Sequence, residues 1–327
     1  MPESIPAPAS ILVYVGLDAV GDGLIKLPFA RALRAAFPAA RITWMAGKGH
    51  TVYADTLAPL VAGLIDEVLD EAGIGSRLPE LLRNPLPGRE FDLIIDTQRR
   101  LLTTLILKRI RHRRFISAAA RHLLSDARPE SPHRPSAMVA QLMALVDLAS
   151  GTALRTAAPL PRDPAVETLA ESLLPPGPVY VGLAPGAGGK HKCWPLERFC
   201  EVANRLAATG AVPVFLLGPA EGDWVGIVRT TVPTALLPLQ QVDGASPMLT
   251  IALARRMRAA LANDSGTGHM LAAADIALVS LFGPTPADKF APSAGRLTIL
   301  KAQDFGGSTM ESIPLPEVEK AMAKCLL

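Results

Sequence analysis

The residues best suited to chemistry stand at positions 263–269, where the chain reads Asn-Asp-Ser-Gly-Thr-Gly-His. Apolar segments flank this stretch, so it is predicted to be a turn that leads from a strand into a short helix. Ser265 or Thr267 can cap that helix, which leaves backbone N–H groups and the positive end of the helix dipole directed at one spot. Two glycines allow close approach of the backbone. The stretch is typical of a phosphate site, although a turn that only joins a strand to a helix fits it equally well.

A second chemical feature is Asp22, which stands between two glycines after the first apolar run of the chain. A carboxylate in such a turn can take a proton from a hydroxyl group and act as a general base. It can instead cap a helix that is predicted to begin near Leu24. Because the glycines leave the carboxylate exposed, we favour the general base, and Asp18 is the competing candidate.

Several familiar motifs are absent from the chain. The turn after residues 11–17 lacks the GxGxxG pattern of dinucleotide-binding dehydrogenases. Residues 186–190 read Gly-Ala-Gly-Gly-Lys, but Ala184 and His191 stand where a P-loop requires glycine and serine or threonine. Neither HExxH nor GxSxG occurs, so a zinc protease or a serine hydrolase gets no support.

The chemical residues must be positioned by strands and helices that alternate along the chain. Apolar runs at 11–17, 41–46 and 92–96 are predicted strands, and residues 24–37 carry apolar side chains at helical spacing. A second alternation begins with the predicted strand 179–184. The pattern predicts an α/β protein of two Rossmann-like, doubly wound domains, with an interdomain cleft where the carboxyl ends of strands meet loops.

The domain boundaries follow from composition. An N-terminal domain is predicted over residues 1–160, a proline-rich interdomain connection over 161–178, and a C-terminal domain over 179–327. The final helix, residues 315–327, is free in this scheme to pack back on the N-terminal domain.

Composition limits the function classes further. The 327 residues include 33 basic and 30 acidic side chains, a balance that does not indicate nucleic-acid binding. Three scattered cysteines indicate neither a disulfide framework nor a zinc site. No apolar run approaches the roughly 20 residues of a membrane span, and the first ten residues lack the form of a signal peptide. We therefore expect a cytoplasmic protein.

Three groups of residues together resemble glycosyltransferase family nine, the lipopolysaccharide heptosyltransferases. They are Gly21-Asp22 with Pro28, Leu33-Arg34, Pro38 and Ile42; Pro185-Gly186-Ala187 with Lys192-Cys193-Trp194-Pro195; and Asn263–Gly266 with His269 and Leu281–Thr285. Their order and spacing extend the resemblance over nearly the whole chain. It implies a GT-B fold in which the first domain holds the acceptor and the second holds a nucleotide sugar. ADP-heptose is the expected donor, with inversion at the anomeric carbon.

The resemblance also implies roles for single residues. Asp22 matches the catalytic base, and Lys192 matches a cation that stabilises the charge of the leaving diphosphate. Glu221 falls where family members often contact the nucleoside ribose, whereas Trp194 is expected to pack its loop. The implied donor-binding residues are Gly186, Lys192, Glu221, Asp264, Ser265, Gly266, Thr267, Gly268 and His269. His269 has helix packing as its alternative role. No metal and no cofactor are implied, because a helix end and Lys192 can balance the diphosphate charge.

The densest charge run, residues 108–114 (KRIRHRR), is a candidate for the acceptor side. Arg111 and Arg113 of this run, with Arg99 and Arg100, could meet phosphates or carboxylates of an anionic glycolipid. A solvated basic face explains the run equally well, and such a face would favour peripheral association with the inner membrane.

Other function classes stay open. A protein of the same fold could use another nucleotide sugar, or could bind a nucleotide sugar without transferring it. The presence of both Asp22 and Lys192 favours transfer. An NAD-binding oxidoreductase is disfavoured by the missing GxGxxG pattern.

Overall fold

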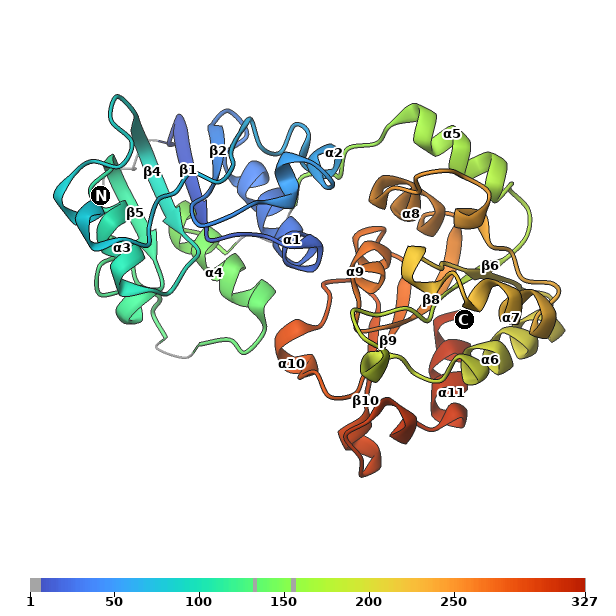
Figure 1. The fold of residues 1–327 in the computed structure, drawn as a ribbon. Coiled ribbons are helices and arrows are strands. Elements are labelled where there is room, and N and C mark those ends of the chain that lie inside the picture. The colour runs from blue at the N-terminus through green and yellow to red at the C-terminus, as the bar shows by residue number, and fades with distance from the viewer. Residues whose placement is uncertain (1–6, 132–133, 154–156, 327) are drawn as a thin grey trace. The chain divides into compact units, whose positions relative to one another are not determined.

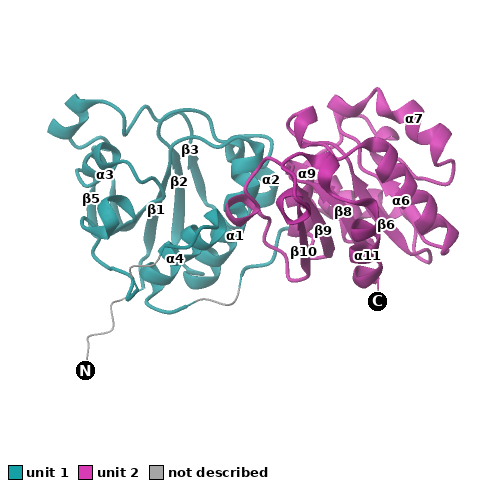
Figure 2. Ribbon diagram, turned by 90° about the horizontal axis from the view of Figure 1, so that it is seen from below, with its two compact units in different colours: residues 1–161 teal, residues 162–327 magenta. Residues whose placement is uncertain are grey.

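The computed structural model describes residues 7–131, 134–153 and 157–326, and it divides into two compact units. The first is Met1–Pro161 and the second is Arg162–Leu327 (Figure 2). Each unit contains its own five-stranded parallel sheet with helices around it (Figure 1). The predicted α/β class with two Rossmann-like halves is confirmed.

In the first unit the strand order is β3-β2-β1-β4-β5. The strands are β1 (Ser10–Val15), β2 (Arg41–Ala46), β3 (Glu67–Leu69), β4 (Glu90–Asp96) and β5 (Arg111–Ser117). The helices are α1 (Val20–Ala36), α2 (Ala58–Val61), α3 (Leu101–Leu107) and α4 (Met138–Ser150), with short 3-10 helices η1 (Val52–Ala54), η2 (Leu78–Leu82) and η3 (Ala119–His122). The central strand β1 is fully buried from Ile11 to Val15, which explains its unbroken apolar sequence.

In the second unit the strand order is β10-β9-β8-β6-β7. The strands are β6 (Tyr180–Ala184), β7 (Val212–Phe215), β8 (Met257–Asn263), β9 (Ala277–Phe282) and β10 (Leu297–Lys301). The α-helices are α5 (Pro164–Leu173), α6 (Leu196–Ala208), α7 (Trp224–Thr231), α8 (Pro247–Ala254), α9 (Gly266–Ala273), α10 (Ala287–Phe290) and α11 (Leu315–Leu326). Short 3-10 helices are η4 (Lys190–Lys192), η5 (Pro219–Glu221), η6 (Pro238–Gln240), η7 (Ala302–Phe305) and η8 (Met310–Ser312).

Both faces of the second sheet are covered, and residues of β6 alternate between them. Val181 and Leu183 lie in a core that includes residues of α6 and α11. Tyr180 and Ala184 lie in a second core with residues of α5, α8 and α9. This is the two-sided burial that a parallel sheet requires, and it holds the loops at the carboxyl ends of the strands in fixed places.

Two segments named in the predicted domain scheme pack in the second unit. The proline-rich connection predicted over 161–178 contains α5, which packs against α8 with Ala170 and Leu174 fully buried. This helix is therefore a structural part of the second unit. The apolar face of α11, with Val318 and Met322, is also buried in the core of the second unit.

Candidate functional site

The loops after β6 and β8 meet at the carboxyl edge of the second sheet. β6 lies between β7 and β8, so the direction in which the chain winds changes between β6 and β8. Such a switch point is the usual place for a ligand in an open α/β sheet. Asn263 joins the loops there: its Nδ2 donates to the Pro185 carbonyl oxygen over 2.7 Å, and its Oδ1 accepts from Trp194 N over 3.2 Å. Because Asn263 is fully buried, these hydrogen bonds hold the two loops in fixed positions relative to each other.

Lys192 is brought to this switch point from η4. Its Nζ lies 3.3 Å from Oδ2 of Asp264, the residue that follows β8. The lysine side chain is 32% exposed and the aspartate side chain 11%. The ammonium group therefore stands beside the start of α9 and still reaches solvent. A cation in this position can meet the negative charge of a diphosphate.

The amino end of α9 provides backbone donors at the same place. Ser265 is the N-cap, and its Oγ accepts from Gly268 N over 3.2 Å. Asp264 N donates to the Leu281 carbonyl oxygen over 3.0 Å. Within the ranges that the structure describes, the N–H groups of Ser265, Gly266 and Thr267 have no protein acceptor.

The cradle predicted from Asp264 to Gly268 is therefore too wide. Its two end N–H groups are already bonded within the protein, and three donors between them stay available to an anion. Gly268 has a packing role, because a Cβ there would lie 3.0 Å from the Asn263 carbonyl oxygen and 3.5 Å from Ala262 Cβ. The glycine lets α9 approach the end of β8 closely.

His269 lies on the buried side of α9 and is 8% exposed. Burial lowers the pKa of His269 below its ordinary value, and the nearby Asp264 carboxylate only opposes this shift. Burial therefore favours the neutral imidazole, and helix packing is the role that this burial supports.

Glu221 lies close to the loop after β6. Its Oε2 accepts from Gly218 N over 2.8 Å and so caps η5. A Cβ on Gly186 would lie 2.5 Å from the Glu221 carboxyl carbon, so the glycine backbone lies directly against this carboxylate. The structure thus brings together Gly186 and Glu221, two of the predicted donor-binding residues.

Trp194 packs its loop, as predicted. Its side chain is fully buried, and its Nε1 donates to the Ile313 carbonyl oxygen over 3.0 Å. The ring meets Phe199 edge-on, with centroids 5.4 Å apart. It is not available to stack on a base.

Asp22 of the first unit occupies the third position of α1, because this helix begins at Val20 rather than near Leu24. Its Oδ2 accepts from Ala19 N over 3.4 Å, which is a long capping bond. The side chain is only partly buried. The carboxylate therefore caps the helix weakly and stays accessible, which is compatible with either role that the sequence left open.

Asp18 is excluded as the competing base. The residue is 2% exposed, and its carboxylate accepts from Lys26 Nζ, from Trp44 Nε1 over 3.1 Å and from Thr51 Oγ1 over 2.9 Å. A buried carboxylate whose oxygens accept from three donors has its hydrogen bonds satisfied within the protein and is held away from a substrate. The network ties α1 to β2 and η1. Little in the sequence indicated this network, because Lys26 stands among apolar helix positions and no partner for it is evident.

The predicted acceptor-binding arginines do not form one group. β4 and β5 are parallel, and Glu90 pairs with Arg111 whereas Asp96 pairs with Ser117. Arg111 and Arg113 thus lie at the amino edge of the first sheet, and Arg99 and Arg100 follow its carboxyl edge. The strands span roughly 20 Å between these edges at about 3.3 Å per residue.

The basic run itself has structural partners. Arg113 Nε lies 3.3 Å from Asp92 Oδ1, and Arg114 donates to the carbonyl oxygens of Leu148 and Ala149 over 2.6 Å each. Arg114 thereby satisfies carbonyl groups at the end of α4. Within the run, Arg114 therefore joins β5 to the end of α4, and Arg113 joins it to β4.

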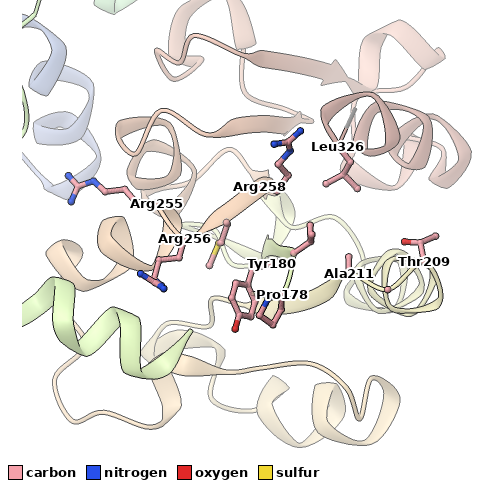
Figure 3. Close-up of a pocket in the computed structure, with 11 residues that line it drawn as sticks. Pro178, Tyr180, Thr209, Ala211, Arg255, Arg256, Arg258 and Leu326 are labelled. Carbon is pink, nitrogen blue, oxygen red and sulfur yellow. The ribbon is translucent and has the colours of Figure 1, made fainter. Parts of the chain in front are cut away.

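A hollow of about 580 Å³ lies at the other edge of the second sheet (Figure 3). Its lining includes Tyr180 at the start of β6 and Met257 and Arg258 at the start of β8. Because the strands are parallel, this is the edge opposite Lys192 and Asp264. The hollow takes no part in the candidate site.

No described helix is long and apolar enough to cross a membrane. Among the same residues, no three His, Cys, Asp or Glu side chains are grouped so as to hold a metal ion.

Comparison with known proteins gives a family match, a similar sequence and two similar structures. Residues 81–312 match the family described as glycosyltransferase family 9 (heptosyltransferase). Lipopolysaccharide heptosyltransferase 1 of Pseudomonas aeruginosa is 32% identical over 132 residues, which are 40% of this chain and only 36% of that protein. The glycosyl transferase family 9 structure from Veillonella parvula superposes with a TM-score of 0.74 at 19% identity, covering 97% of both chains. E. coli heptosyltransferase WaaC with ADP gives a TM-score of 0.68 at 16% identity, covering 97% of this chain and 99% of that one.

Proposed function

Because the chain belongs to glycosyltransferase family 9, the heptosyltransferase family, we propose that it transfers a heptose from ADP-heptose to an acceptor hydroxyl with inversion at the anomeric carbon. The proposed acceptor is the lipopolysaccharide core or a related anionic glycolipid, reached from the cytoplasmic side of the inner membrane. The similar fold of WaaC, which was solved with ADP and with ADP-2-deoxy-2-fluoro heptose, supports the choice of donor.

One observation carries the proposal: Lys192 Nζ, paired with Asp264, stands beside three N–H groups at the amino end of α9 that have no acceptor in the described chain. All these donors meet at the switch point of a parallel sheet. A diphosphate fits them in charge and in hydrogen-bonding capacity. Close by, Glu221 is the proposed contact of the ribose hydroxyls, because a carboxylate accepts hydrogen bonds from both.

The proposed reaction is a single displacement. The oxygen of the acceptor hydroxyl forms a bond to the anomeric carbon of the heptose, and the bond from that carbon to the diphosphate oxygen breaks. Asp22 takes the proton of the hydroxyl. The electron pair leaves with ADP, whose growing charge is stabilised by Lys192 and the N–H groups of α9. Attack from the face opposite the leaving group inverts the configuration.

The donor half is tested by thermal denaturation with ADP, UDP, GDP and NAD. A nucleotide at a hundred times its Kd stabilises the native state by about 2.7 kcal/mol, so ADP should raise the Tm clearly. A larger rise with UDP or GDP would indicate another nucleotide sugar. Stabilisation by NAD alone would contradict the transferase.

The transfer itself is tested with ADP-heptose and a lipopolysaccharide-core acceptor. The acceptor should gain the mass of one heptose, and nuclear magnetic resonance of the product should show the inverted anomer. Tight binding of ADP without product, across a panel of glycan acceptors, would instead support a protein that binds a nucleotide sugar without transferring it.

A further inference from the structure

One surface of the first unit carries exposed leucines on three short segments: η2, α3 and the turn after η3. The side chains are Leu78 (69% exposed), Leu82 (79%), Leu101 (52%), Leu105 (37%) and Leu123 (64%). On α3 the two leucines are four residues apart and lie on one side, while Leu102 packs against the core. Since α3 contacts both η2 and η3, these five residues belong to one region, called here the leucine surface.

Arginines surround the leucine surface. Arg77 and Arg83 flank η2, Arg100 precedes α3, and Arg121 lies in η3; all four are exposed. Among the described residues none of these guanidinium groups forms an ion pair with a carboxylate. The carboxylate of Glu80 is used locally, accepting from Gly75 N over 2.5 Å and from Arg77 N over 2.9 Å.

The charge of the surrounding chain has the same sign. The segments 77–83, 100–105 and 119–123 together contain four arginines and a single acidic residue, Glu80. A group of apolar side chains surrounded by cations matches an anionic lipid bilayer, which is apolar inside and negatively charged at its surface.

Two other occupants fit the leucine surface less well. A second copy of the chain would place arginine against arginine across a two-fold axis, which is repulsive. A protein partner usually finds tryptophan or tyrosine at the centre of an interface, and leucine is under-represented among such anchors. The leucine surface has five leucines and no aromatic side chain.

We propose that the leucine surface docks the protein on a membrane containing anionic lipid. The leucine side chains enter the boundary between headgroups and acyl chains, and Arg77, Arg83, Arg100 and Arg121 bind lipid phosphates. This docking needs neither the sugar donor nor the acceptor. It also differs from docking by the basic run, since Arg111 and Arg113 lie at the amino edge of the sheet.

The full chain is tested by co-sedimentation with vesicles of phosphatidylcholine, with and without phosphatidylglycerol, in the absence of any substrate. We expect binding only to the anionic vesicles, and its reversal by salt. Leu78→Glu with Leu82→Glu, and separately Arg77→Gln with Arg83→Gln, should each lower the partition coefficient at least about tenfold. Because these side chains are exposed, thermal unfolding should not change.

Two matched variants make the test specific. Ile227→Glu places the same charge on a residue of α7 that is 50% exposed, and it should leave binding unchanged. Arg111→Gln with Arg113→Gln should also have little effect. If the variant with Leu78→Glu and Leu82→Glu fails to fold, Leu105→Glu takes its place in the binding test.

Three results would overturn the proposal. The first is equal binding by wild type and the leucine variants, and the second is a loss confined to the Arg111 and Arg113 variant. The third is a concentration-dependent dimer in light scattering that the leucine variants abolish, which would make the surface a protein interface. ADP binding, measured in parallel, reports on the proposed function independently.

Discussion

Asp22 has two candidate roles, general base and helix cap, and only the first requires the carboxylate to take up a proton. Asn keeps the size of Asp and can still accept the 3.4 Å bond from Ala19 N, but it cannot take up a proton at neutral pH. If Asp22 is the general base, Asp22→Asn should leave Tm and ADP affinity unchanged and lower kcat by about 10²–10⁴. Steady-state kinetics with ADP-heptose measure this. Near-normal turnover would assign Asp22 to helix capping alone, since Asn is an equally good cap.

Lys192 permits a second test at the residue scale. Removing its ammonium takes away a charged hydrogen bond to the diphosphate and leaves the Asp264 carboxylate without its cation. Lys192→Ala should therefore weaken ADP binding by about 1.5–3 kcal/mol. Turnover should fall further, by roughly 10²-fold, because the leaving group is more negative in the transition state.

Lys190→Ala is the matched control for this variant, because Lys190 lies in the same short helix and is exposed. Isothermal calorimetry with ADP should distinguish the two lysines. If both variants bind like the wild type, the ammonium of Lys192 does not contact the nucleotide.

At the scale of elements, Asp96 connects β4, β5 and α3. This fully buried carboxylate accepts from Thr104 Oγ1 over 2.6 Å, Gln98 N over 2.8 Å and Ser117 Oγ over 2.9 Å. Burial raises the pKa of Asp96 to about 6 from 3.8, against the opposing effect of these bonds. Because the folded pKa is the higher one, the stabilising contribution is fully present below pH 4 and is lost as the pH rises through 6.

Asp96→Asn should remove this part of the pH dependence. Urea unfolding of the wild type between pH 4 and pH 7 should include a loss on the order of 2–3 kcal/mol that the variant lacks. Asp288→Asn, at an exposed position of α10, is the control. A variant with the wild-type slope would mean that Asp96 is charged throughout this range.

At the scale of the whole molecule, the second unit contains both of its own hydrophobic cores and every residue of the proposed donor site. A fragment of residues 162–327 should therefore unfold cooperatively and bind ADP with an affinity close to that of the full chain. It should not transfer heptose, because Asp22 belongs to the first unit. Calorimetry on the fragment checks this. A folded fragment that fails to bind ADP would show that residues of the first unit are needed for the nucleotide.

Much of the fold and of the proposed donor site could be predicted from local sequence. Apolar runs and helical spacing predict the alternating strands and helices, because the repeat of each element depends on neighbouring residues. Ser265 as a helix cap was also predicted, and this role comes from the residue types within a few positions. Trp194 packs its loop as expected, but its hydrogen-bond partner Ile313 is distant in the chain. Local rules were weaker at helix ends, where α1 begins at Val20, four residues before the predicted start.

The sequence by itself therefore determined the fold class and the two halves, and it indicated the loops that carry Lys192 and Ser265. Only the tertiary structure decided that Asp18 is enclosed in a buried network and that Arg99 and Arg111 lie at opposite edges of a sheet. It also decided that Asn263 ties two loops together. The physical reason is that these outcomes depend on strand register and burial among residues distant in the chain, which no local spacing encodes.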